Sequence, residues 1–301
     1  MKPEVLVFAA SPSRSVMEQL DRHFHCHHVY QQPAAGQDAY IDRVAPNVRG
    51  IMTIGPIGVS AALAARLPRL EIVALNSVGY DKIDFEALRP RGVLVTNTPD
   101  VLTDDVADLT VLLVLASARR LPAMDRFVRN GDWAARKPLV PARSVRGKVA
   151  GIFGFGRIGQ AIGARLAALG MEIRYHQPRA IPGVAVPRAD SLLDLARQSD
   201  YLILAAPANP ATLRAVDAAV MDALGPEGTL VNIARGSLVD EEALVGALQT
   251  GRLGAAALDV FDQEPQVPDA LRSLENVVLT PHIGSLTAET RHAMGQLTVD
   301  N

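Results

Sequence analysis

Apolar and polar positions alternate along the chain in short, regular blocks. In the first hundred residues, runs rich in β-branched and other apolar side chains predict strands at residues 4–9, 50–54, 72–76 and 93–97. Amphipathic stretches at residues 13–23 and 58–67 fit helices between them. Strands that alternate with helices are typical of a parallel sheet with helices on its faces. This part of the chain therefore predicts a small α/β domain.

The same alternation returns more strongly after residue 148. A long helix is expected at residues 102–120, and an irregular polar stretch that contains Trp133 follows it. Strands are then predicted at residues 149–153, 172–176, 201–205, 229–233, 255–260 and 277–280, with helices of about 10–12 residues between most of them. Such a series matches one dinucleotide-binding domain. The expected fold class is α/β, with two doubly wound parallel-sheet domains of the Rossmann-like or flavodoxin-like kind.

Composition and charge narrow the classes of function. The chain has 30 basic and 32 acidic residues, a formal net charge of -2, so no basic stripe for nucleic acid is expected. Its one cysteine, Cys26, rules out an intrachain disulfide and favours a reducing compartment. No apolar run reaches the ~20 residues of a membrane span, and the run at residues 5–10 is short for a signal peptide. A cytoplasmic protein without a membrane partner is expected.

A glycine-rich turn follows the strand at residues 149–153. Its three glycines have the spacing GxGxxG and are followed by a helical pattern that ends near Gly170. This strand–turn–helix context is what a dinucleotide fingerprint requires, because the helix N-terminus offers N–H groups to the pyrophosphate. The predicted cofactor-binding residues are Gly154, Phe155, Gly156, Arg157, Ile158 and Gly159.

The end of the next strand indicates which dinucleotide binds. NAD-binding domains place an acid there, about 20 residues past the turn, to bind the ribose 2′-hydroxyl. The sequence instead has Gln177, with Arg179 two residues later. An arginine attracts a 2′-phosphate and can bind it bidentately. We therefore expect Gln177 and Arg179 to contact NADP(H), with NAD(H) used at lower preference. The alternative is that Arg179 is a solvated surface residue.

Three polar residues follow the later strands, at the sheet edge where α/β proteins bind ligands. Arg235 leaves a buried strand among small residues, and we expect it to clamp a substrate carboxylate; the alternative is a salt bridge at a sheet edge. His282 suits acid–base chemistry near neutral pH, although a lone histidine in a loop is more often structural. Glu264 could orient His282 and stabilise the imidazolium, or it could belong to a solvated acidic loop. Together the three predict a catalytic site.

These segments resemble the D-isomer-specific 2-hydroxyacid dehydrogenase family, most closely its glyoxylate/hydroxypyruvate reductase branch. The resemblance extends over the glycine turn and over residues 76–84, 101–108, 232–244, 258–265 and 281–285. It implies a substrate domain at residues 1–99 plus 286–301, an NAD(P)-binding Rossmann domain at residues 100–285, and an active site in the cleft between them. It also implies a homodimer, in which the segment around Trp133 resembles the family's dimerisation arm.

The resemblance also implies roles for single residues. Arg235 would bind the carboxylate and carbonyl of the substrate, His282 would be the proton donor, and Glu264 would pair with His282. The remaining implied contacts are Val78 and Gly79 to the substrate carboxylate, Asp259 and Ile233 to the nicotinamide side, and Pro207 to the cofactor. No metal is implied.

Two features depart from the family pattern. Pro178 stands where NADP-using members often have an arginine, so Arg179 would bind the 2′-phosphate alone or with Arg157. Members also usually continue, beyond the point corresponding to Asn301, with a helix that returns to the first domain.

The resulting hypothesis is NADPH-dependent reduction of glyoxylate or hydroxypyruvate to a D-2-hydroxy acid. Two alternatives stay open. One is a dehydrogenase for a bulkier 2-keto acid, and the other is a non-catalytic, NAD(P)-sensing protein that resembles a corepressor. A separate feature is the run of histidines at residues 23–28. In a strand, His23, His25 and His27 would share one face, and we expect a surface edge there rather than a metal site.

Overall fold

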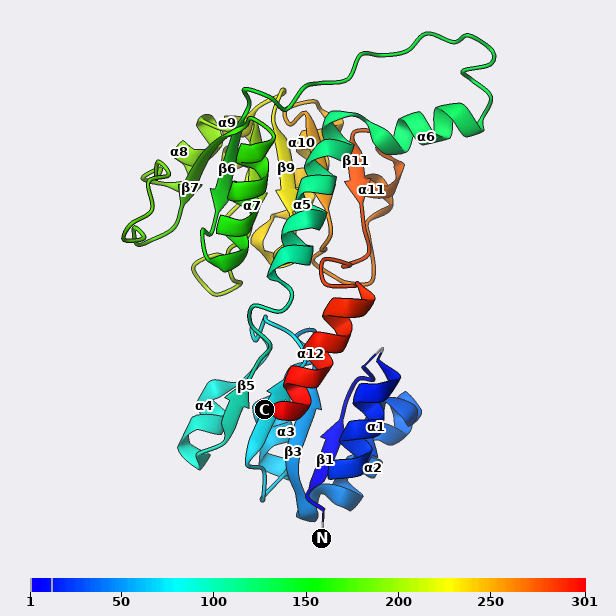
Figure 1. Cartoon of the computed structure of the whole chain (residues 1–301), viewed down its shortest axis with the longest axis vertical. Coiled ribbons are helices and arrows are strands. Elements are labelled where there is room, and N and C mark those ends of the chain that lie inside the picture. The colour runs from blue at the N-terminus through cyan, green and yellow to red at the C-terminus, as the bar shows by residue number, and fades with distance from the viewer. Residues whose placement is uncertain (1, 12) are drawn as a thin grey trace. The chain divides into compact units, whose positions relative to one another are not determined.

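Two parallel sheets organise the chain (Figure 1). The computed structural model describes residues 2–11 and 13–301. The chain divides into a first unit, Met1–Leu102 with Ser285–Asn301, and a second unit, Thr103–Gly284. The family resemblance implied domain boundaries between residues 99 and 100 and between residues 285 and 286. Each unit is an α/β layer structure, which confirms the predicted fold class.

The first unit contains a five-stranded sheet of order β2-β1-β3-β4-β5, with every neighbouring pair parallel. This is the flavodoxin-like order of a doubly wound sheet. Its strands are β1 (Glu4–Val7), β2 (His25–His28), β3 (Val48–Thr53), β4 (Ile72–Leu75) and β5 (Leu94–Thr96). Its helices are α1 (Arg14–His23), α2 (Gln37–Val44), α3 (Ala61–Arg66), α4 (Phe85–Leu88) and α12 (Ala288–Asp300).

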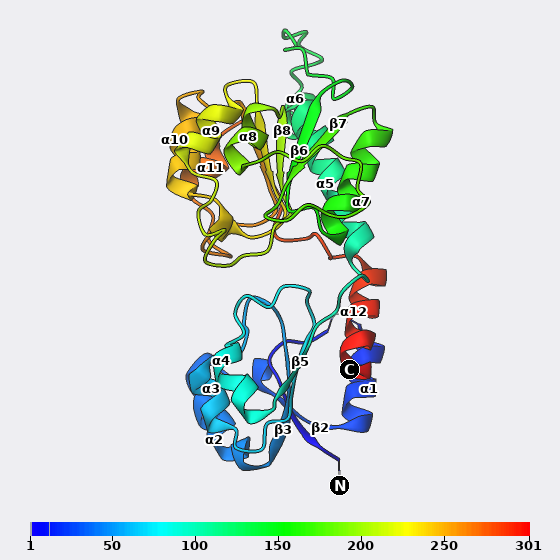
Figure 2. The same ribbon diagram turned by 90° about the vertical axis from the view of Figure 1, so that its left-hand side faces the viewer.

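Alternation along the strands decides which helices cover which face. Leu6 belongs to a cluster with side chains of α2, α3 and α4, whereas Val5 and Val7 pack with Leu20 of α1. Successive side chains of a strand point to opposite faces, so β1 anchors both layers. Figure 2 shows α2, α3 and α4 on one side of this sheet and α1 with α12 on the other.

The last helix, α12, returns the chain to the first unit. The Thr287 side chain caps it by accepting a hydrogen bond from the Thr290 N–H at 3.2 Å. Gly295 lets it approach α1 closely, because an added Cβ would lie 2.9 Å from Val16 Cγ1. The returning helix that the family resemblance placed after Asn301 thus lies before it.

The second unit contains a six-stranded parallel sheet of order β11-β10-β9-β8-β6-β7. All four residues of β8 and of β9 are buried, as expected of central parallel strands covered on both faces. The strands are β6 (Val149–Phe153), β7 (Glu172–His176), β8 (Tyr201–Leu204), β9 (Thr229–Asn232), β10 (Ala255–Leu258) and β11 (Val277–Leu279).

Helices cover both faces of this sheet (Figure 2). On one side are α5 (Thr103–Ala118) and α7 (Arg157–Ala168), and on the other are α8 (Leu192–Arg197), α9 (Ala218–Leu224), α10 (Glu241–Gln249) and α11 (Asp269–Ser273). The expectation of 10–12-residue helices was wrong for α8, α9 and α11, which are only one or two turns long. Within residues 2–11 and 13–301, no helix combines the length and apolarity needed to cross a membrane.

The stretch after residue 120 is only partly irregular. It begins with α6 (Leu121–Arg129), which is separated from α5 by Arg120 in a left-handed conformation (φ 53°). Pro122 lies in its first turn, where a missing N–H costs no helical hydrogen bond. No residue of α6 is buried, although Leu121, Met124 and Val128 recur at helical spacing.

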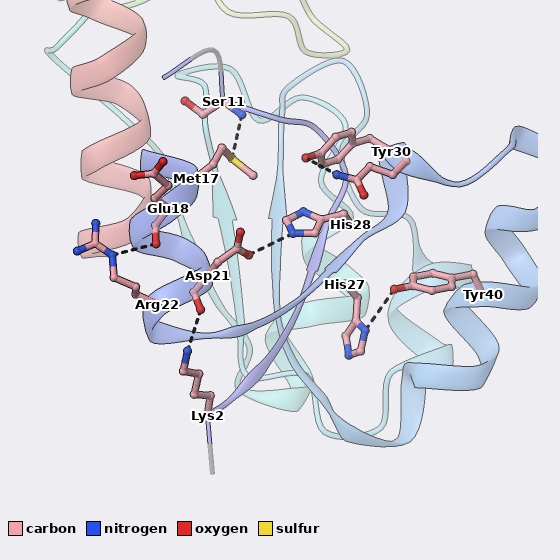
Figure 3. A network of polar contacts seen from close by, with 11 residues as sticks. Lys2, Ser11, Met17, Glu18, Asp21, Arg22, His27, His28, Tyr30 and Tyr40 are labelled. Atoms are coloured by element: carbon pink, nitrogen blue, oxygen red, sulfur yellow. Dashed lines mark hydrogen bonds and ion pairs between the residues drawn. The ribbon is translucent and has the colours of Figure 1, made fainter. Parts of the chain in front are cut away.

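The histidine-rich segment is an edge strand built into the first unit. His23 ends α1, and β2 begins at His25, so the expected common face for His23, His25 and His27 was wrong. His27 is buried; one ring nitrogen pairs with Glu4 Oε2 at 2.8 Å and the other faces Tyr40 Oη at 3.4 Å. Figure 3 shows the contact with Tyr40. The surface-edge interpretation holds for the strand but not for this side chain.

Candidate active site

The glycine turn after β6 requires glycine at two positions. Gly154 has φ 91°, and an added Cβ would lie 2.5 Å from Ala206 Cα. At Gly159 a Cβ would lie 2.2 Å from the carbonyl oxygen of Gly154. These contacts pack the first turn of α7 tightly against the ends of β6 and β8, so the N-terminus of α7 is fixed at the carboxyl edge of the sheet.

Gly156, by contrast, leaves an open approach. It caps α7, and a Cβ added to it would meet nothing within 4 Å. The first turn of a twelve-residue helix has N–H groups without intrahelical partners and the positive end of the helix dipole. The turn therefore fits the pyrophosphate of a dinucleotide, which would approach over Gly156.

Phe155 and Ile158 supply packing within this turn. The Phe155 ring is 3% exposed and stacks on Tyr175 with 4.7 Å between ring centroids. Ile158 packs against the same core. The Phe155 N–H donates to Gln177 Oε1 at 3.1 Å. The Phe155 ring therefore packs the turn against the core, and its N–H already has an acceptor in Gln177.

Gln177 links the glycine turn to the end of β7. Its side chain accepts from Phe155, and its Nε2 donates to the Arg179 carbonyl oxygen at 2.7 Å. The position where an NAD-binding domain has a carboxylate is thus filled by a neutral, fixed amide. Arg157 in the first turn of α7 and Arg179 two residues after Gln177 are both exposed.

The predicted catalytic trio comes from neighbouring strands of the second unit. Arg235 follows β9, Glu264 lies in the loop after β10 and His282 follows β11, and these strands are adjacent in the sheet. His282 Nδ1 and Glu264 Oε2 are 2.8 Å apart, with 38% and 29% of the two side chains exposed. The predicted pairing is therefore present, on a surface that solvent reaches.

The charge state of Glu264 follows from its neighbours. Burial by itself would raise the pKa of Glu264, but hydrogen bonds from the His282 ring and the Phe261 N–H, with the positive charge of Arg235, lower it below its ordinary value. Glu264 is therefore an ionised acceptor at neutral pH. An ionised carboxylate can only accept hydrogen bonds, so His282 carries a proton on Nδ1.

Asp259 shapes the loop that holds His282. It is 1% exposed, and its two oxygens accept from Thr280 Oγ1 at 2.6 Å, Ile283 N at 2.8 Å and Gly284 N at 2.9 Å. Burial raises the pKa of Asp259, and these hydrogen bonds oppose the rise. The carboxylate thus braces the loop, in which His282 has the left-handed φ of 54°. That Asp259 also lines the nicotinamide side remains a prediction.

Two residues that were not among the predicted site residues position Arg235. Asn232 donates from Nδ2 to the Arg235 carbonyl oxygen at 2.8 Å and accepts from the Ala234 N–H at 3.0 Å. Gly236 lies against Phe261, where an added Cβ would be 1.9 Å from the carbonyl carbon. The turn with Arg235 is therefore pressed directly against the loop that leads to Glu264.

The other predicted residues lie in two places. Ile233 and Pro207 follow β9 and β8 in the second unit, Ile233 against the core and Pro207 exposed. Val78 and Gly79 follow β4 in the first unit. Their carbonyl oxygens accept from Asn97 Nδ2 at 3.0 Å and Ser77 Oγ at 2.9 Å, which fixes the two peptide planes.

Comparison with known proteins identifies the family of the chain. The profile of the "D-isomer specific 2-hydroxyacid dehydrogenase, NAD binding domain" family matches residues 111–284. A glyoxylate/hydroxypyruvate reductase A from Arabidopsis thaliana is 45% identical, and a hydroxyphenylpyruvate reductase from Plectranthus scutellarioides 44% identical; each alignment covers 98% of this chain and 94% of the relative.

A solved structure extends the likeness to three dimensions. It is an NADPH-dependent glyoxylate/hydroxypyruvate reductase from Sinorhizobium meliloti in complex with NADP and malonate, 41% identical, with a TM-score of 0.89 over 100% of this chain and 92% of that one. Similarity along the whole chain, together with the dinucleotide turn, identifies an oxidoreductase that uses a nicotinamide dinucleotide. The chain belongs to the D-isomer-specific 2-hydroxyacid dehydrogenase family, in its glyoxylate/hydroxypyruvate reductase branch.

Proposed function

We propose that this protein reduces small 2-keto acids, glyoxylate and hydroxypyruvate, to D-2-hydroxy acids with NADPH. The observation that carries the proposal is the 2.8 Å pair of His282 and Glu264 beside Arg235, at the carboxyl ends of adjacent strands. A proton donor, a group that orients it and a cation for a carboxylate are what reduction of a 2-keto acid requires.

His282 supplies the proton. Because Glu264 holds the proton on Nδ1, the reacting proton is the one on Nε2 of the doubly protonated ring. It passes to the keto oxygen as that atom becomes an alkoxide, and the ring is left neutral with its Nδ1–H still bonded to Glu264. The bound dinucleotide supplies the hydride. Glu264 acts as a positioning residue, because it reaches the substrate only through His282.

Arg235 binds the substrate carboxylate and polarises the adjacent carbonyl. A guanidinium matches a carboxylate in geometry and charge, and Asn232 and Gly236 fix the turn that presents it. The backbone N–H groups of Val78 and Gly79 are proposed as the partners of the carboxylate in the first unit.

The preference for NADPH follows from charge. With Gln177 in place of an acid, no carboxylate occupies the position that would bind the ribose 2′-hydroxyl, and Arg179 two residues away is a cation that attracts a 2′-phosphate. The Sinorhizobium relative is NADPH-dependent. NADH would serve as a weaker substitute.

The proposal is tested by following NADPH and NADH oxidation by the purified protein with glyoxylate, hydroxypyruvate, hydroxyphenylpyruvate and 2-ketogluconate. We expect the highest kcat/KM for the pair of NADPH with one of the two small acids, and a D-configured product from hydroxypyruvate. Equal efficiency with both dinucleotides would refute the cofactor preference. Absence of turnover with every acid would favour a cofactor-sensing binding protein.

A bulkier substrate is the second candidate. Ile57 follows β3 and Tyr80 follows β4 at the carboxyl edge of the first sheet, and the two residues are 45% and 53% exposed. Apolar surface at this edge could contact an aromatic substituent, and a hydroxyphenylpyruvate reductase is 44% identical. A higher kcat/KM for hydroxyphenylpyruvate in the same panel would favour this candidate.

We also propose that the protein forms a homodimer through α6 and the segment after it. Leu121, Val128, Trp133, Leu139 and Val140 are each more than half exposed, and exposed apolar side chains grouped in this way mark protein interfaces. Light scattering after size exclusion should give twice the chain mass of 32.1 kDa. A monomer at micromolar concentration would contradict the proposal.

A further inference from the structure

We infer that Arg188, a residue outside the fingerprint, is a second arginine of the 2′-phosphate site. Residues 187–189 extend the sheet beyond its edge strand β7. Tyr175 N donates to Pro187 O at 3.1 Å, and Ala189 N donates to Tyr175 O at 2.8 Å. This short parallel bridge occupies the place of the third strand in a dinucleotide-binding domain.

The bridge directs Arg188 toward the ligand edge of the sheet. Arg188 is the register partner of Tyr175, yet its Nη1 donates to the carbonyl oxygen of Gln177 at 3.0 Å. Gln177 lies two residues nearer the carboxyl end of the strand, so the guanidinium extends along β7 to that end. His176 Nδ1, 2.9 Å from the Ala189 carbonyl oxygen, fixes the segment against the strand.

The guanidinium has capacity for a further ligand. Among the residues that the structure describes, its contacts are the hydrogen bond to Gln177 and a 3.8 Å ion pair with Asp190, whose side chain is 93% exposed. Guanidinium has five N–H donors in a planar fork. A phosphate with two charges would compete well with one solvated carboxylate at that distance. The Arg188 side chain is itself 31% exposed, so a ligand can reach it.

Its position selects the 2′-phosphate rather than the pyrophosphate. Gln177 stands where an NAD-binding domain places the acid that binds the ribose 2′-hydroxyl, and Arg188 is bonded to that same residue. The pyrophosphate lies instead over Gly156, at the N-terminus of α7. Arg188 and Arg179 would therefore hold the 2′-phosphate from two sides of Gln177. This inference rests on the proposed preference for NADPH.

Binding of nucleotide fragments by the full chain tests the inference without turnover. Calorimetric titration would compare 2′,5′-ADP, which carries the phosphate, with 5′-AMP, which lacks it, on the wild type, Arg188→Gln and Arg174→Gln. Arg174 is the matched control, because it lies on β7 and donates to Gln198. For Arg188→Gln we expect a loss of about tenfold or more for 2′,5′-ADP and a change within about twofold for 5′-AMP. The control should keep both affinities.

The possible outcomes distinguish a role for Arg188 from the proposed preference for NADPH. Equal weakening of both ligands by Arg188→Gln would mean that Arg188 only braces the loop, and unchanged binding of both would mean that it has no role; each refutes the inference and leaves the NADPH preference intact. A wild type that binds both ligands equally would refute the preference and the inference together. Retained selectivity in Arg188→Lys with loss in Arg188→Gln would support the charge-based role.

Discussion

Replacement of Glu264 by glutamine removes the charge beside His282 and keeps the shape. Hydrogen bonds to charged groups contribute about 1.5–3 kcal/mol. Because the His282 and Glu264 side chains are 38% and 29% exposed, solvent screening favours the lower end, about 1.5 kcal/mol. At about 1.4 kcal/mol for each factor of ten, kcat should fall about tenfold. KM should change little, since Glu264 does not touch the substrate.

The pH profile distinguishes positioning from a general loss of structure. The pKa of Glu264 lies below its ordinary value because of the His282 ring, the Phe261 N–H and Arg235, although burial opposes this. In the wild type, the support from the carboxylate should therefore be lost only as pH falls through that lowered pKa, and Glu264→Gln should lack this acid limb. Glu241→Gln is the matched control. Glu241 begins α10 and accepts at 3.3 Å from the N–H of Asp262, which lies in the same loop as Glu264, but it does not pair with His282. The reasoning is refuted if both variants lose the same activity, or if the Glu264 profile keeps its shape.

Two further substitutions test the framework of the site. Gly236→Ala should lower the free energy of unfolding by about 1–3 kcal/mol and reduce kcat, because its Cβ would collide with Phe261; in Gly246→Ala, where the nearest atom is 4.0 Å away, urea unfolding should show no loss. Asp200→Asn removes the ion pair with Lys148, at a cost of about 1 kcal/mol at pH 7. Despite burial, hydrogen bonds lower the pKa of Asp200, so this stability is present above the ordinary carboxyl pKa and is lost as pH falls through the lowered one; a difference that does not shrink as pH falls below the ordinary carboxyl pKa would contradict this.

The strands of the second unit and the glycine turn could be predicted from the local sequence pattern. Strands β6 and β7 have the predicted bounds, Val149–Phe153 and Glu172–His176. Gly154 ends the apolar run of β6, whereas β7 begins shortly after Gly170 and ends before Pro178. The adjacency of Arg235, Glu264 and His282 was also foreseeable, since carboxyl ends of parallel strands share one edge of the sheet.

The remaining features depend on contacts that local pattern does not carry. The brace from Asp259 to the His282 loop joins residues more than twenty positions apart. The close packing of Gly236 on Phe261 likewise joins separate loops. Arg188 reaches Gln177 only because a short bridge folds back along β7. Burial of His27 could not be foreseen either, because its partners Glu4 and Tyr40 come from another strand and a helix.

The central claim is that His282 delivers the proton while the dinucleotide site forms independently. The measurement is single-turnover reduction of glyoxylate by NADPH-loaded enzyme, wild type against His282→Gln, with NADPH affinity titrated by fluorescence on the same preparations. We predict a rate lower by about 100-fold or more in the variant, with NADPH affinity within about twofold of the wild type. A variant that binds NADPH normally and still reduces glyoxylate at the wild-type rate would contradict the account.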